Sequence, residues 1–239
     1  MSSYFITGTD TDVGKTIATT LLTLYFKHKD KNVFPYKPIQ SGAIEHNGEQ
    51  TAPDVLCYTQ ALPSLNSNSA YTYLLNKPYS PHLAAKEEQT TIQIDRIRTH
   101  ISQLKQNYDH VLVEGAGGVM VPIHEDGYDM RSLMKDLALP VIVVARAGLG
   151  TINHTLLSIM ALEQANIPIA GILLNELEQD SDQTINDDNY KMIEKLSGKP
   201  IIGVIPYMTD IELAFQQTEL LEPLFKSFDK HLLEGVTNK

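Results

Sequence analysis

The chain has 239 residues, of which 42% are hydrophobic and 20% are charged, and its formal net charge is -10. An acidic chain without a cluster of lysine or arginine argues against binding to nucleic acid or to a membrane surface, because contacts with phosphate groups need concentrated basic charge. Its single cysteine excludes an internal disulfide and a multi-cysteine metal site, and no apolar run approaches the roughly 18 residues that span a bilayer, so we expect a cytoplasmic protein.

Six short apolar runs, most of them rich in β-branched residues, are typical of strands that are buried on both faces. These predicted strands are Tyr4–Thr9, Val33–Ile39, His110–Glu114, Pro140–Ala145, Ile169–Asn175 and Pro200–Pro206. Apolar residues at 3-4-3 spacing predict a helix over residues 92–104, and further helices are expected after Lys15, Met130, Thr151, Asp188 and Asp210. The alternation predicts an α/β fold, a mainly parallel sheet flanked by helices, in a single domain over residues 1–239.

Two polar segments interrupt this pattern. Residues 59–81, with three prolines and three tyrosines, are interpreted as a long excursion over the surface. Residues 178–188, with four aspartates, are interpreted as a solvated loop. Since ligands of parallel sheets bind beyond the carboxyl ends of the strands, the polar residues at the strand ends are the candidates for function.

The stretch TGTDTDVGKT, residues 7–16, lies between the first predicted strand and the first predicted helix. The order Gly14-Lys15-Thr16 at such a turn is typical of a phosphate-binding loop, in which backbone N–H groups and a helix N-terminus converge on an anion. Lys15 would reach the β- and γ-phosphates, and the Thr16 hydroxyl would bind Mg²⁺. The usual spacing puts a glycine at position 9, whereas here Gly8 comes one residue earlier. The alternative is an ordinary glycine turn.

Two further polar side chains follow or precede regular elements near this loop. Lys37 closes the second predicted strand, shortly before Ser41, and could neutralise an anion near the γ-phosphate; a solvated lysine is the equal alternative. Considered by itself, Asp54 is better explained as the N-cap of a helix that begins at Val55 than as a functional residue.

Glycines follow two more predicted strands. In VLVEGAGGVMVP, residues 111–122, Glu114 could complete a Mg²⁺ shell while the glycines let the backbone approach a ligand, with a glycine-rich strand exit as the alternative. In residues 145–155 the free amides around Gly150–Asn153 could bind a carboxylate, or the segment could be a tight capped turn. The side-chain amide of Asn175 could form hydrogen bonds with the edge of a purine base, or the residue could only begin a turn.

With these motifs assembled, nearly the whole chain resembles the dethiobiotin synthetase family. The resemblance rests on TGTDTDVGKT, YKPIQSG, SPHLAA, VEGAGGVMVP, ARAGLGTINHT and GVIP. It implies a homodimeric P-loop enzyme that uses ATP, Mg²⁺ and CO₂ to close a ureido ring on 7,8-diaminononanoate through a carbamate and a carbamic–phosphoric anhydride. No protein nucleophile is required by that chemistry.

The resemblance also implies roles for individual residues. Catalytic roles fall to Lys37, Lys15, Thr11 and Ser41, and the metal ligands are Thr16, Asp54 and Glu114. The nucleotide is expected to contact Asp12, Val13, Gly14, Lys15, Thr16, Ile17, Asp54, Glu114, Gly115, Ala116, Gly117, Asn175, Ile205, Pro206, Tyr207 and Glu212. The substrate is expected to contact Ser41, Gly118, Gly150, Thr151 and Asn153, the last three belonging to the other subunit. Glu176 stands where some relatives have a basic residue, which leaves the choice of nucleotide open.

Three other functions fit parts of the pattern. A regulatory ATPase of the partitioning type would share the phosphate loop, but it would carry a signature lysine where Asp10 stands. An amidase-coupled ligase such as a cobyrinate enzyme usually has an additional glutaminase domain with a nucleophilic cysteine, a role that Cys57 in a helical stretch does not fit. A nucleotide-binding subunit without chemistry would leave Lys37 without a purpose.

Overall fold

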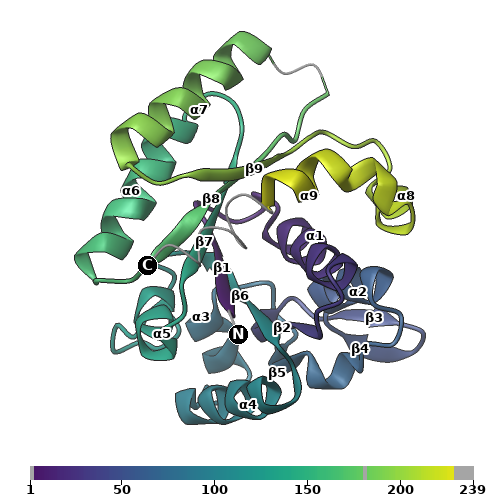
Figure 1. The fold of residues 1–239 in the computed structure, drawn as a ribbon. Helices are drawn as coiled ribbons and strands as arrows, with labels where there is room; N and C mark the ends of the chain where they lie inside the picture. The colour runs from purple at the N-terminus through teal and green to yellow at the C-terminus, as the bar shows by residue number, and fades with distance from the viewer. Residues whose placement is uncertain (1–2, 180–181, 229–239) are drawn as a thin grey trace.

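The computed structural model describes residues 3–179 and 182–228, except for the side chain of Glu212. Seven strands form one sheet in the order β5-β2-β6-β1-β7-β8-β9, and every neighbouring pair is parallel (Figure 1). The strands are β1 Tyr4–Gly8, β2 Val33–Ser41, β5 Tyr71–Leu75, β6 His110–Gly118, β7 Val141–Arg146, β8 Ile169–Asn175 and β9 Ile201–Ile205. The α/β prediction of a parallel sheet is therefore confirmed.

Helices cover both faces of this sheet (Figure 1). On one face lie α1, α8 and α9, and on the other lie α4, α5, α6 and α7. The helices are α1 Lys15–His28, α2 Pro53–Ala61, α3 Pro81–Glu87, α4 Ile94–Asn107, α5 Met130–Leu137, α6 Thr151–Gln164, α7 Gln183–Ser197, α8 Ile211–Gln216 and α9 Glu222–Phe228. Within the described part of the chain, none of them is long and apolar enough to cross a membrane.

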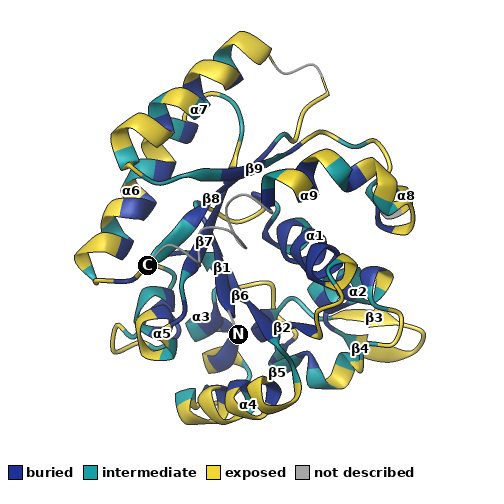
Figure 2. Ribbon diagram, in the orientation of Figure 1, coloured by how far each residue is buried: buried dark blue, intermediate teal, exposed yellow. Residues whose placement is uncertain are grey.

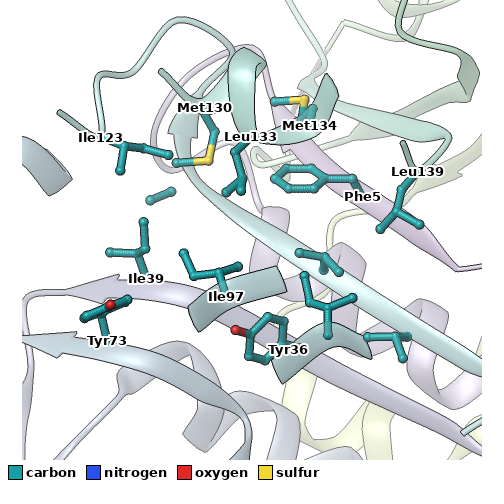
Figure 3. Close-up of a cluster of buried hydrophobic side chains, with 14 of the residues drawn as sticks. Phe5, Tyr36, Ile39, Tyr73, Ile97, Ile123, Met130, Leu133, Met134 and Leu139 are labelled. Atoms are coloured by element: carbon teal, nitrogen blue, oxygen red, sulfur yellow. The ribbon is translucent and has the colours of Figure 1, made fainter. Parts of the chain in front are cut away.

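Successive side chains of β1 pack into the core on opposite faces of the sheet, because side chains alternate in direction along a strand. Ile6 packs into the cluster of α1, α8 and α9, whereas Phe5 packs with Leu133 and Met134 of α5 (Figure 3). The central strands of the sheet are buried on both faces, and the outer faces of the helices are exposed (Figure 2). Such burial explains why the strands read as nearly continuous apolar runs in the sequence.

The chain differs from the expectation between residues 44 and 81. Residues 59–81 are not only a surface excursion, since Tyr71–Leu75 form β5 at the edge of the sheet, paired with β2. Before it, β3 Ile44–His46 and β4 Glu49–Thr51 form an antiparallel hairpin. Asn47 and Gly48 make its turn with φ of 53° and 80°, the left-handed conformation that two-residue hairpin turns require.

Three element boundaries also differ. Helix α7 begins at Gln183, not after Asp188, because Asp182 is its N-cap and its carboxylate accepts from the amides of Thr184 and Ile185. Strand β6 does not end at Glu114 but continues to Gly118, which lies beside Gly8 of β1. The N-cap of α2 is Ala52, so the interpretation of Asp54 as a cap is wrong.

Candidate active site

The phosphate loop joins β1 to α1 beside the centre of the sheet. Gly14 is the N-cap of α1 with φ of 92°, and its own carbonyl accepts from the Ala18 amide at 2.9 Å. Asp12 also has a positive φ of 58°. The Lys15 ammonium donates to the carbonyl oxygen of Asp10 at 2.8 Å, so this lysine folds back over the loop. The geometry is that of an anion-binding turn at a helix N-terminus.

The early glycine of the loop has a steric explanation. A Cβ on Gly8 would lie 2.7 Å from Cγ2 of Val13 and 2.9 Å from the carbonyl oxygen of Asp10. The loop therefore passes directly over Gly8, and a side chain at position 8 would push it away. The close approach of the loop to β1 therefore explains why this motif has a glycine at position 8.

Lys37 lies at the centre of a buried charged cluster. Its Nζ is 2.5 Å from Oδ2 of Asp54 and 2.8 Å from Oε1 of Glu114, and it donates to the carbonyl oxygen of Gly115 at 3.1 Å. Thr16 Oγ1 donates to the same Oε1 of Glu114 at 2.9 Å. The phosphate loop, β2, α2 and β6 thus bring together the predicted metal ligands and the predicted catalytic lysine.

The charges of this cluster support one another. Burial would lower the pKa of Lys37, but Glu114 and Asp54 outweigh it and hold that pKa above its ordinary value. Burial would raise the pKa of Asp54, but the Lys37 ammonium outweighs it and leaves that pKa below its ordinary value. Burial, and then the like charge of Lys37, lower the pKa of Lys15. The buried charges of Lys37, Asp54 and Glu114 persist here because the lysine is paired with both carboxylates.

The oxygen ligands around Thr16 fit Mg²⁺. A hydroxyl and two carboxylates are hard donors, and Mg²⁺ is usually held by one or two carboxylates together with substrate phosphates. Among residues 3–179 and 182–228, no group of three or more His, Cys, Asp or Glu side chains could hold a metal ion.

A cavity of about 780 Å³ opens over this cluster. Its lining includes most of the residues predicted from the sequence, namely Thr11, Asp12, Gly14, Lys15, Thr16, Ile17, Lys37, Ser41, Asp54, Glu114, Ala116, Gly117 and Asn175. It also includes residues that had no predicted role, namely Gln40, Gly42, Pro78, Tyr79, Ser80, Pro81, Val121 and Leu177. Residues 78–81 reach the cavity because they follow β5, which was not predicted as a strand.

Asn175 closes one end of the phosphate loop. Its Nδ2 donates to the carbonyl oxygen of Val13 at 3.1 Å. A Cβ on Gly14 would lie only 2.0 Å from that nitrogen. The residue therefore fixes the loop whether or not it also meets a nucleobase.

Several predicted contact residues do not line this cavity. The segment 205–207 begins with the last residue of β9, and Gly118 ends β6 beside Gly8. Gly150, Thr151 and Asn153 begin α6, outside the lining of the cavity, and the side chain of Glu212 lies outside the described residues.

Sequence comparison decides the family. The ATP-dependent dethiobiotin synthetase BioD of Halalkalibacterium halodurans is 44% identical over 95% of this chain and 94% of its own length. The enzymes of that name from Anoxybacillus flavithermus and Bacillus subtilis are 44% and 36% identical over 88% of this chain, and 94% and 90% of their lengths are matched. The chain belongs to the ATP-dependent dethiobiotin synthetase family. The resemblance and the enzyme class predicted from the sequence, an ATP-dependent ligase, are confirmed.

More distant comparisons describe the fold. A family model described as an AAA domain matches residues 2–214. The MinC:MinD cell division protein complex of Aquifex aeolicus gives a TM-score of 0.61 at 17% identity, covering 98% of this chain and 97% of that chain. A ParA family ATPase from Chlorobium tepidum gives 0.53 at 16% identity over the full length of both chains. At these identities the likeness supports the P-loop NTPase fold of this dethiobiotin synthetase family member and nothing about its partners.

Proposed function

We propose that this protein is an ATP- and Mg²⁺-dependent ligase that carboxylates 7,8-diaminononanoate with CO₂ and closes the ureido ring of dethiobiotin, releasing ADP and phosphate. The observation that carries the proposal is the Lys37 ammonium, which lies at the cavity wall between Asp54 and Glu114. A phosphate loop alone binds nucleotide, whereas a second buried lysine beside it can hold the negative charge of a transferring phosphoryl group.

The reaction uses the cavity for positioning and charge. One substrate amine adds CO₂ to give a carbamate, and a carbamate oxygen attacks the γ-phosphate of ATP while ADP leaves. The second amine then attacks the carbonyl carbon of the mixed anhydride, and the bond from that carbon to the phosphate oxygen breaks. Bound Mg²⁺ supplies charge neutralisation between the phosphates, with Thr16, Asp54 and Glu114 as the residues that would hold it.

The protein contributes donors and cations to each step. Lys15 and the amides of the loop hold the triphosphate, and Lys37 neutralises charge where the carbamate oxygen and the γ-phosphate meet. Thr11 and Ser41 line the cavity, which supports a contact between these residues and the transferring group. Holding the reactants together converts a bimolecular step into an effectively unimolecular one, which can supply a large part of the rate enhancement.

A homodimer is part of the proposal. The outward face of α6 and the segment before it expose large apolar side chains, namely Leu149, Leu157 and Met160, which are 76%, 56% and 53% exposed. Leu157 and Met160 are three residues apart and share one face of α6, and burying them with Leu149 against a second copy would remove all three from water. It would also bring the first turn of α6, with Asn153, toward the partner's cavity and the substrate carboxylate.

Measurement of phosphate release tests the activity. MgATP, bicarbonate and 7,8-diaminononanoate are supplied together and then omitted one at a time, and dethiobiotin is identified by mass. The proposal predicts phosphate release only when all are present, in amounts equal to dethiobiotin. Phosphate release that is unaffected by omitting the diamine would favour the regulatory ATPase alternative.

A further inference from the structure

Tyr58 is a buried residue of α2 whose hydroxyl reaches the charged cluster. It follows Asp54 by four residues, and residues four apart lie on the same face of a helix. Asp54 meets Lys37, and one turn later the Tyr58 hydroxyl donates to Oε2 of Glu114 at 2.5 Å. Tyr58 is fully buried and does not line the cavity, and its hydroxyl contacts the site through Glu114.

The two oxygens of Glu114 have different partners. Oε1 accepts from Thr16 Oγ1 at 2.9 Å and from Lys37 Nζ at 2.8 Å, whereas Oε2 accepts from Tyr58. Only 1% of Glu114 is exposed, which leaves little room for water to replace a lost donor. With Oε2 fixed by the tyrosine, the carboxylate keeps Oε1 directed at the groups that face the cavity.

The hydroxyl of Tyr58 is the donor in its hydrogen bond with Oε2 of Glu114. A neutral phenol held in this way donates one proton in one direction. Its geometry therefore constrains the carboxylate in a way that a mobile water molecule would not.

We propose that Tyr58 is a positioning residue that orients the Glu114 carboxylate toward Mg²⁺ and Lys37, an assignment that rests on the proposed function of this site. Groups that orient metal-binding side chains typically change metal affinity or activity by about 10–100-fold when they are removed. The competing explanation is that the hydroxyl only satisfies its own hydrogen bond in the core.

Tyr36 offers a matched control. It is also a fully buried tyrosine, and its hydroxyl makes a hydrogen bond with Thr72, which does not line the central cavity. It lies in the hydrophobic cluster beside Ile97 of α4 (Figure 3). Tyr58→Phe and Tyr36→Phe each remove one buried hydroxyl and keep the ring, so a purely structural role predicts similar behaviour for both.

The experiment measures the affinity of each purified protein for a non-hydrolysable ATP analogue over a range of Mg²⁺ concentrations, and then kcat. For Tyr58→Phe we expect the Mg²⁺ concentration at half-maximal effect to rise by about 10–100-fold, with unchanged affinity for the analogue in the presence of a chelator. For Tyr36→Phe we expect the Mg²⁺ dependence of the wild type. An unchanged Mg²⁺ requirement and kcat in Tyr58→Phe, or an equal shift in Tyr36→Phe, would overturn the proposal.

A double variant tests the route through Glu114. If Tyr58 acts by orienting that carboxylate, Tyr58→Phe should add little to the Mg²⁺ requirement once Glu114→Gln is present, because the two changes remove parts of one interaction. Independent, additive shifts would contradict the assignment. The binding measurements need no diamine, so they remain informative even if the wild-type protein fails to make dethiobiotin, an outcome that would instead overturn the proposed function.

Discussion

The Lys37 ammonium lies 2.5 Å from the carboxylate of Asp54, a residue 17 positions later in the chain and the first acidic residue of α2. The pair connects β2 to the first turn of that helix at the wall of the cavity. Because Asp54 is also a candidate Mg²⁺ ligand, the arrangement predicts that metal and lysine share the same carboxylates.

Lys15→Ala and Lys37→Ala should fail in different ways. Lys15→Ala should weaken nucleotide binding as well as turnover. Lys37→Ala should keep the nucleotide affinity and lower kcat by about 10²–10³-fold, because the Lys37 ammonium is proposed to stabilise charge mainly in the transition state. Calorimetric titration with ADP, alongside phosphate release, separates the two effects. Near wild-type turnover by Lys37→Ala would remove that lysine from catalysis.

Glu114→Gln should raise the Mg²⁺ requirement, because a neutral amide is a poorer ligand than a carboxylate for a hard cation. The variant should fold, as the apolar residues of β6 before it supply the packing. A Mg²⁺ titration of phosphate release measures the change. If the titration matches that of the wild type, Thr16 and Asp54 are the remaining candidates.

Gly14→Ala should destroy nucleotide binding. Its φ of 92° disfavours a side chain, and the new Cβ would lie 2.0 Å from Nδ2 of Asn175. Gly127→Ala is the matched control, because Gly127 has φ of 95° but no atom within 4 Å of the added Cβ. Both variants share the backbone strain, so comparable nucleotide affinities would refute a specific role for the contact between Gly14 and Asn175.

Acid should destabilise the metal-free protein partly through Asp54. Burial would raise the pKa of this carboxyl, but Lys37 outweighs it and leaves the pKa below its ordinary value. A carboxyl of this kind adds stability above its ordinary pKa, and that stability is lost as the pH falls through the lower, folded-state value. When unfolding is measured in the presence of a chelator from about pH 6 to about pH 3, the free energy of unfolding should fall less steeply for Asp54→Asn than for the wild type. If the free energies of unfolding of the two proteins fall equally with pH, Asp54 makes no such contribution to stability.

Two differently impaired chains should complement each other in a homodimer. Lys37→Ala keeps the turn at Gly150–Asn153, and Asn153→Glu keeps the phosphate chemistry but repels the substrate carboxylate. With random mixing, about half of the dimers would be mixed and each would have one intact site, which gives roughly a quarter of wild-type activity in a symmetric assembly. Phosphate release after co-refolding measures it. No recovery, with mixed dimers shown to form, would place the carboxylate site within one chain.

Local sequence was enough for six of the seven strands of the sheet and for the phosphate loop. The apolar runs of β1, β2, β6, β7, β8 and β9 have little polar character because both of their faces are buried, and Gly14-Lys15-Thr16 combines a steric requirement with a helix start. These features depend on neighbours in the chain. Because the strands are parallel, most of the candidate residues at strand ends meet at one edge of the sheet.

Other features depend on contacts that local patterns do not specify. The alternation in Tyr71–Leu75 indicates a strand, but polar flanking residues and prolines obscured it. The carboxylate of Asp182 caps α7, although four aspartates nearby suggested a loop. Tyr58 was not singled out because its partner, Glu114, is 56 residues away, and only the packing of α2 against the sheet brings them together.

Oxygen transfer from CO₂ to phosphate is the most direct test of the proposed reaction. The enzyme is mixed rapidly with C¹⁸O₂, MgATP and 7,8-diaminononanoate, and the released phosphate is analysed by mass spectrometry. Because a carbamate oxygen attacks the γ-phosphate and then leaves with it, the account predicts one ¹⁸O atom in each phosphate and one dethiobiotin per phosphate. Unlabelled phosphate, released at the same rate without the diamine, would contradict it.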